Sequence, residues 1–290
     1  MQISIKASRL DEFRKRTFRS SDDWHLRSPE QAVDYVNERG FIFFWPVKGV
    51  SFPSLWAAVA GERPVAEAHE DAGHITWDWK DSLLDKKVWY YARILRGKNT
   101  IVSMDTIPFF YALSPNYGDP EADLEEQYFQ GHLPMEAKQI FETLLRKGPL
   151  DTISLRKEAH LTGERSNSPF TRALDLLQRQ LVVLPVKVVE AGAWNYAFVY
   201  DLTHRYLPDL PEKARYISEA HAMEQLLIRF FASLGAASFK QTNALFRWDP
   251  NLLQPMLDRM VKTGILRESI HLENTAESLY CLSTDLDSLL

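Results

Sequence analysis

The chain has 290 residues, of which 45% are hydrophobic and 25% charged, and its formal net charge is −5. These values indicate a globular protein with room for two or three domains, and the negative charge excludes a general electrostatic attraction to nucleic acid. No apolar run reaches the roughly 20 residues that span a bilayer, so we expect no membrane segment and a cytoplasmic protein. The single cysteine, Cys281, excludes an internal disulfide and has apolar neighbours, which favours a buried structural thiol.

Positive charge is concentrated near the N-terminus. The stretch "SRLDEFRKRTFRS", residues 8–20, contains five basic residues and two acidic ones. The simplest interpretation of such a run is a solvated helical face. Nucleic-acid binding, if it occurs, must come from local basic faces of this kind.

A helix is predicted from Ser28 to Arg39, with Ser28 as its N-terminal cap and Gly40 at its end. The stretch "GFIFFWPVKG" follows, and its residues 41–46 are bulky and uncharged. This strand-like segment is either part of the core or the wall of a pocket in which a base stacks. Further helices are predicted over 52–61 and 85–97, and a strand over 99–105, which together suggest a winged-helix-like unit over residues 1–115.

The densest group of chemically active side chains is "HEDAGHITWDWKD", residues 69–81. Its histidines, His69 and His74, match no established metal-ligand spacing, so we expect no metal and no cofactor. In an extended conformation, the two tryptophans would share one face and Asp78 and Lys80 the other. The tryptophans would then stack on an extruded base while a carboxylate activates water, or the indoles would be core.

An acidic linker over residues 114–127 precedes a second unit, expected over 134–203. Apolar spacing predicts helices over 135–148, 151–160 and 167–180, the last capped by Ser168 with Pro169 behind it. Two strand-like segments, 181–189 and 195–202, follow with a glycine-containing turn between them. Three helices followed by a hairpin is the element order of a winged helix.

The same order recurs over residues 217–290, after a linker at 203–216. Helices are predicted over 221–235, over 238–246 with Ser238 as cap, and over 249–262 with Asp249 as cap and Pro250 in the first position. Strands are predicted over 265–272 and 278–282. The repeat predicts an α+β, mainly helical fold built from tandem winged helix-turn-helix units.

In a winged helix the third helix usually enters a DNA groove, so its outward polar residues are the candidate DNA contacts. For the middle unit these candidates are Arg165, Arg172, Gln178 and Arg179; for the last unit they are Gln254, Arg259 and Lys262. Asp175 and Asp258 interrupt the two faces. Lys48 and Lys80 are candidate phosphate anchors; Trp45, Trp77 and Trp79 are candidate stacking surfaces; Asp78 and Asp81 are candidate catalytic carboxylates.

The tandem units and the string "FFWPVKGVSFPSLWAAVAG" resemble the bacterial AlkZ/YcaQ family of winged-helix DNA glycosylases. The resemblance is most specific around Gly40–Gly61 and in the second winged helix. It implies double-stranded DNA, damaged or crosslinked, as the partner. It also implies hydrolysis of the glycosidic bond by a tripeptide of glutamine, a hydrophobic residue, and aspartate or glutamine, placed just after an early helix.

The chain departs from that pattern at the tripeptide itself. The family's positions fall on Phe43, Phe44 and Trp45, which offer no acceptor atom, and an indole N–H cannot act as a general base. Three interpretations therefore stay open. The chain is a DNA-binding relative without the family's reaction, a glycosylase with a relocated carboxylate, or a winged-helix scaffold that binds protein or a small ligand.

Overall fold

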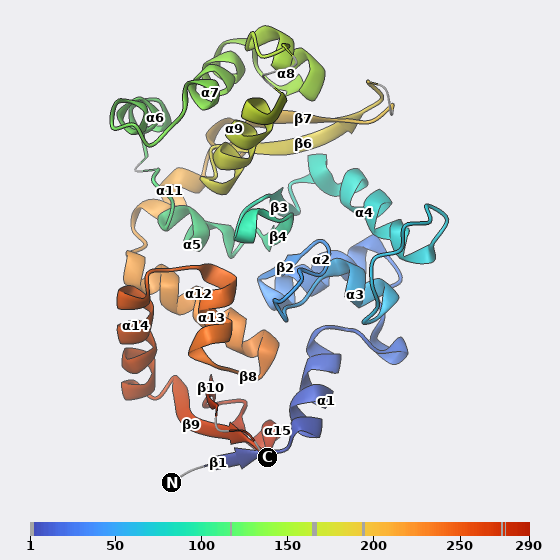
Figure 1. Ribbon diagram of the computed structural model, residues 1–290, viewed down its shortest axis with the longest axis vertical. Helices are drawn as coiled ribbons and strands as arrows, with labels where there is room; N and C mark the ends of the chain where they lie inside the picture. The colour runs from blue at the N-terminus through green and yellow to red at the C-terminus, as the bar shows by residue number, and fades with distance from the viewer. Residues whose placement is uncertain (1–2, 117, 164–166, 193–194, 274, 276) are drawn as a thin grey trace. The chain divides into compact units, whose positions relative to one another are not determined.

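The structure is a computed structural model that describes residues 3–116, 118–163, 167–192, 195–273, 275 and 277–290 (Figure 1). The fold is α+β and mainly helical, as predicted. The chain divides into two compact units, one made of Met1–Trp79 and Ala220–Leu290, the other of Lys80–Glu219. The finer division into winged-helix units over 1–115, 134–203 and 217–290 stays a prediction. Within the described ranges, no helix has both the length and the apolar character needed to cross a membrane.

The first unit opens with short elements around the predicted helix. They are β1 (Ile3–Ile5), α1 (Ala7–Thr17), the 3-10 helix η1 (Asp22–Trp24), α2 (Pro29–Arg39), β2 (Phe41–Phe43), α3 (Leu55–Ala60) and the 3-10 helix η2 (Ala72–His74). Helix α4 (Ile75–Leu83) begins in this unit and ends in the second. The Ser28 side chain accepts a hydrogen bond from the Gln31 amide, and Gly40 ends α2 with a φ of 80°. Both ends of α2 are therefore as predicted.

The C-terminal part of the first unit contains the predicted helices and hairpin. Its elements are α12 (Glu219–Leu234), β8 (Ala236–Ala237), α13 (Phe239–Phe246), α14 (Pro250–Lys262), β9 (Leu266–Leu272), β10 (Ser278–Leu282) and α15 (Leu286–Leu289). Ser238 and Gln241 form a reciprocal capping box at the start of α13. Asp249 caps α14 through the Asn251 amide. These local signals confirm the three helices of this region.

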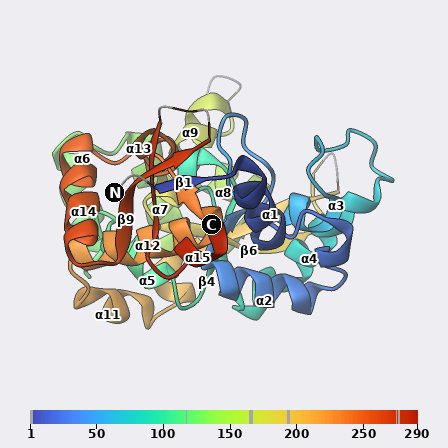
Figure 2. The ribbon, with the colours of Figure 1, turned by 90° about the horizontal axis from the view of Figure 1, so that it is seen from below.

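The first strand of the chain completes a sheet with the last hairpin, which the sequence did not predict. The sheet order is β1-β9-β10-β8, and β1 pairs with β9 in parallel, with Ile3 opposite Ile270. Figures 1 and 2 both show β1 lying beside β9. Cys281 is buried in the core between this sheet and α1, where burial raises its thiol pKa to about 12. The prediction of a buried structural thiol is confirmed.

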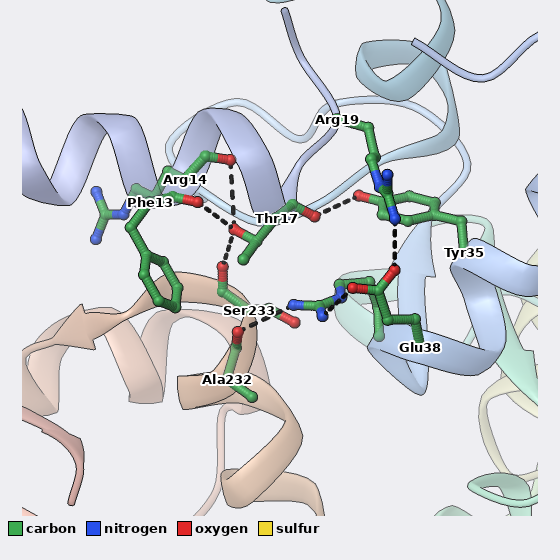
Figure 3. Close-up of polar contacts among 9 residues, drawn as sticks. Phe13, Arg14, Thr17, Arg19, Tyr35, Glu38, Ala232 and Ser233 are labelled. Atoms are coloured by element: carbon green, nitrogen blue, oxygen red, sulfur yellow. Dashed lines mark hydrogen bonds and ion pairs between the residues drawn. The ribbon is translucent and has the colours of Figure 1, made fainter. Parts of the chain in front are cut away.

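One basic residue of α1, Arg14, connects this helix to the end of α12. Arg14 donates from Nε to the Leu234 carbonyl at 3.1 Å and from a terminal nitrogen to the Ala236 carbonyl at 2.8 Å. The Thr17 hydroxyl donates to the Ser233 carbonyl at 2.7 Å (Figure 3). These donors satisfy carbonyls at and just beyond the end of α12, where cations are also favoured by the helix dipole. Other basic residues of the stretch 8–20 form ion pairs: Arg9 with Glu12, Lys15 with Asp11, and Arg19 with Glu38.

The second unit packs short strands against helices. Its elements are the 3-10 helix η3 (Leu84–Lys86), β3 (Trp89–Ala92), the 3-10 helix η4 (Leu95–Gly97), β4 (Thr100–Ser103), α5 (Ile107–Ala112), α6 (Pro120–Phe129), α7 (Met135–Lys147), β5 (Leu150–Asp151), α8 (Thr152–Glu158), α9 (Asn167–Arg179), β6 (Val183–Val189), β7 (Ala197–Leu202), α10 (Thr203–Tyr206) and α11 (Leu210–Arg215). Strands β5, β7 and β6 form an antiparallel sheet in that order. Helix α9 packs against α7 and β6 beside the β6–β7 hairpin (Figure 1).

Three predictions in this unit are wrong, one of them the linker at 203–216, which contains α10 and α11. Residues 85–97 do not form one helix, because β3 occupies part of this range and pairs antiparallel with β4. Short apolar runs rich in aromatic residues do not distinguish strand from helix by periodicity, and the long-range pairing decides the outcome. The acidic linker at 114–127 also contains most of α6, which Asp119 caps and Pro120 begins.

Candidate nucleic-acid interface

The segment that holds the family's tripeptide positions is mostly core. Phe43 and Phe44 are 0% and 2% exposed, and Phe41 stacks on Phe52 with ring centroids 5.1 Å apart. Trp45 is half-buried and stacks on Phe44 at 5.5 Å. Among the described residues the Trp45 indole nitrogen has no hydrogen-bond partner. Of the two interpretations of this segment, the buried core applies to residues 41–44, whereas Trp45 is half-buried and Pro46 is exposed.

Residues 75–83 form helix α4, so the prediction that Trp77 and Trp79 share one face of an extended segment is wrong. Two residues apart on a helix are about 200° apart around its axis, and the two indoles accordingly separate. Trp79 is 6% exposed, whereas Trp77 is 37% exposed and lies 5.6 Å from Trp45 by ring centroids. Asp78 is exposed, and no cation among the described residues pairs with it. Trp45, Trp77 and Asp78 therefore stay together as candidates, and Trp79 is core.

Lys80 and Asp81 form a closed polar cluster with Tyr196. Lys80 is only 2% exposed, and its Nζ lies 2.7 Å from Asp81 Oδ1 and 2.9 Å from the Tyr196 hydroxyl. That hydroxyl donates to Asp81 Oδ1 at 3.0 Å. Burial lowers the pKa of Lys80, although Asp81 opposes the shift, and burial raises the pKa of Tyr196.

The rings around the Lys80 ammonium complete this cluster. The Phe198, Tyr91 and Tyr196 ring centroids lie 4.6, 5.4 and 5.6 Å from Lys80 Nζ. An ammonium held in this way has no open side for a phosphate, so the prediction of Lys80 as a phosphate anchor is wrong in this conformation. Because Asp81 accepts from both partners, it is also a poorer candidate base than Asp78. Lys48, in contrast, is exposed as predicted for an anchor.

Helix α9 presents a polar outer face that carries two arginines. Arg172 and Arg179 are exposed, and both line a surface pocket of about 400 Å³. The rest of its lining is Pro134, Glu136, Pro169, Ala173, Asp175 and Leu176. Arg172 donates to the Ser168 hydroxyl on its own helix, and among the described residues neither arginine forms an ion pair. Arg165 lies outside the described residues.

Gln178 does not belong to this outer face. It is 3% exposed, so the prediction that it points outward to read a base is wrong. Its Oε1 accepts from the Arg93 amide at 3.3 Å. Arg93 also donates from one terminal nitrogen to both Asp175 oxygens at 2.9 Å. No spacing in the sequence predicts that Arg93 contacts Asp175 and Gln178, because these residues lie more than 80 positions after it.

Helix α14 has the corresponding candidates in a different setting. Arg259 is exposed, but its guanidinium pairs with Glu224 of α12 at 2.8 Å. Gln254 is half-buried and donates to Asp258 at 2.7 Å. Lys262 is exposed. The prediction that Arg172, Arg179 and Arg259 are exposed is confirmed, although Arg259 already has an anionic partner.

Comparison with known proteins identifies the family of the chain. A family model described as "AlkZ related" matches residues 26–247 of the 290 residues. The chain belongs to the AlkZ-related family. No curated protein sequence matches it.

Among solved structures, the DNA glycosylase AlkZ of Streptomyces sahachiroi is similar to this chain. The two share 14% sequence identity at a TM-score of 0.60, over 99% of this chain and 72% of that chain. At this identity the likeness shows the fold. The AlkZ-related match includes α2, the altered tripeptide positions, α4 and α9, and it ends before α14.

Proposed function

We propose that this member of the AlkZ-related family binds double-stranded DNA, damaged DNA included, through the outer face of α9. The observation that carries the proposal is the pair Arg172 and Arg179, both exposed and both lining one pocket. Seven residues along a helix correspond to about 10 Å, so the two guanidinium groups are able to reach two phosphates, or one phosphate and one base edge. Asn167, Ser168 and Thr171 add exposed hydrogen-bonding groups to the same helix.

We also propose that the chain does not release bases through the family's tripeptide positions. Base excision gains mainly from a placed water and from a negative group that stabilises positive charge on the sugar. Phe43 and Phe44 are buried rings, and the Trp45 indole only donates. None of the three supplies an acceptor.

A second candidate function has one observation in its favour. Asp78 is an exposed carboxylate next to Trp77, and the Trp77 ring packs on Trp45 at 5.6 Å. In this alternative a flipped base would stack on Trp77, and Asp78 would supply the relocated carboxylate. This alternative predicts excision without the tripeptide.

Duplex binding tests the first proposal. We expect the wild-type protein to bind a fluorescently labelled duplex at micromolar concentration or below in low salt, with an affinity that falls steeply as salt rises. The Arg172→Ala variant should reduce the logarithmic salt slope by about one unit, and the control Arg146→Ala, an exposed arginine of α7, should not. No binding, or binding that salt does not weaken, would favour a scaffold for protein or a small ligand.

Single-turnover base release, with protein in excess, tests catalysis. The substrates are a duplex with N7-alkylguanine and one with a nitrogen-mustard crosslink, and the proteins are wild type and Asp78→Asn. We expect no release above the uncatalysed rate from either protein. Release by wild type that is lost in Asp78→Asn would establish the relocated carboxylate instead, and release that the substitution leaves unchanged would contradict both assignments.

A further inference from the structure

We infer that Arg93 is a positioning residue of the DNA-facing side of α9, where it acts by neutralising Asp175. This inference rests on the proposed DNA binding through α9 and deepens it. Asp175 stands between Arg172 and Arg179 on the helix and lines the same pocket. An unpaired carboxylate at that place would repel the phosphates that the two arginines attract.

The geometry fixes Arg93 to α9 at two points. Its side chain contacts both oxygens of Asp175 at 2.9 Å, and its backbone amide donates to Gln178 Oε1 at 3.3 Å. Gln178 is buried, and its own amide nitrogen lies 3.4 Å from the Leu174 carbonyl, which holds the acceptor in place. Asp175 and Gln178 are three residues apart and therefore neighbours on the helix surface, with Asp175 half-buried and Gln178 buried, and both accept hydrogen bonds from Arg93.

The charge balance of the pocket depends on this arginine. The lining has two arginines against Glu136 and Asp175, which is a net charge of zero. Arg93 adds one positive charge directly at Asp175, and the pair is partly exposed, with 41% of the Arg93 side chain and 27% of the Asp175 side chain accessible. A net positive surface is what a phosphate backbone requires. An ion pair this exposed contributes little to the stability of the fold.

A cycle of variants separates this role from a direct phosphate contact. Arg93→Ala leaves Asp175 unpaired, so duplex binding should weaken about tenfold near 50 mM salt, the effect of about one phosphate charge. Asp175→Asn frees Arg93 and should tighten binding by a similar factor. The double variant Arg93→Ala/Asp175→Asn has the same net charge as wild type and should bind within about twofold of it. Arg93→Lys should also bind like wild type, because it keeps the charge beside Asp175.

Each other outcome overturns a distinct claim. If Arg172→Ala weakens binding and Arg93→Ala does not, the role of Arg93 falls and the DNA proposal stands. If the double variant is as weak as Arg93→Ala, Arg93 contacts phosphate itself and does not act through Asp175. If wild type does not bind duplex, both proposals fall. Thermal melting checks the fold of each variant. Should Arg93→Ala not fold, an Asp175→Asn variant that does not bind more tightly than wild type refutes the inference.

Discussion

Helices α9 and α14 have the same length, 13 residues, and each follows two helices and precedes a hairpin, yet their outer faces differ. In α9 the arginines are unpaired among the described residues, and the one acidic interruption is neutralised from outside the helix. In α14 the arginine is itself neutralised by Glu224, and Asp258 stays exposed. Leu252 is also exposed on α14. Element order thus predicts a similar backbone for the two regions. The ion-pair partners determine how much unneutralised positive charge each helix presents to a polyanion.

The inner faces of the two helices should be equivalent, and this gives the largest expected effect. Leu177 in α9 and Leu257 in α14 are both fully buried. Leu→Ala at either position should lower the free energy of unfolding by about 3 kcal/mol, because each leaves a cavity in a packed core. Chemical denaturation measures both. A loss well under 1 kcal/mol at one position would show that its helix is not packed as described.

The outer face of α9 should contribute more to duplex binding than the outer face of α14. The double variant Arg172→Ala/Arg179→Ala removes two charges from α9 and should weaken binding about 100-fold in low salt, or about 2.7 kcal/mol. The matched variant Arg259→Ala/Lys262→Ala should have a smaller effect, about tenfold, because Glu224 already neutralises Arg259 and only the Lys262 charge is not neutralised among the described residues. Fluorescence anisotropy across a salt series measures both, and equal losses would remove the distinction between the helices.

Removing the ion-pair partner of Arg259 should slightly increase the contribution of α14 to duplex binding. Glu224→Gln removes the partner of Arg259 and should raise duplex affinity by about threefold, less than a full phosphate contact, because the exposed Asp258 is unaffected. The same titration measures it. An increase of tenfold or more would mean that the Arg259–Glu224 ion pair alone accounts for the weaker contribution of α14 to duplex binding.

The caps of the preceding helices differ in charge, which predicts a small pH effect. Asp151 caps α8 and Ser238 caps α13. Burial acts to raise the Asp151 pKa, but hydrogen bonds from Ser154 and Ile153 outweigh it and hold the pKa below its usual value. A depressed folded-state pKa stabilises the fold above the unfolded-state pKa, and this contribution is lost as pH falls through the folded-state pKa.

The expected size of that effect is about 0.5 kcal/mol, typical of a partly exposed cap. Asp151→Asn should be less stable than wild type by this amount at pH 7, and the difference should disappear at a pH below the folded-state pKa of Asp151. Ser238→Ala should lose stability to the same extent at both pH values, because a hydroxyl does not titrate in this range. A pH-independent difference for Asp151→Asn would show that its charge does not matter.

Local signals predicted the helices, and long-range contacts determined what sequence missed. Helix caps and apolar stripes act within a few residues, so the sequence alone predicts them. This applies to the caps Ser28, Ser238 and Asp249 and to the apolar stripes of α7, α9, α12 and α14. Gln178 borders the α9 stripe, and only the distant Arg93 segment decides that it is buried. Lys80 is buried by rings from β3 and β7, which no spacing along the chain reveals.

The discontinuous first unit has a consequence for the order of events during synthesis. Ile3 of β1 pairs opposite Ile270 of β9, so this pairing cannot form until residue 270 has been synthesised. Residues 80–219, which form the other unit, intervene. At about 5–20 residues per second, translating them takes roughly 10–30 s, during which Leu10 and Phe13 of α1 lack their apolar cover. The apolar residues of α1 are therefore exposed during this time, whereas residues 80–219 are contiguous and can fold as they emerge from the ribosome.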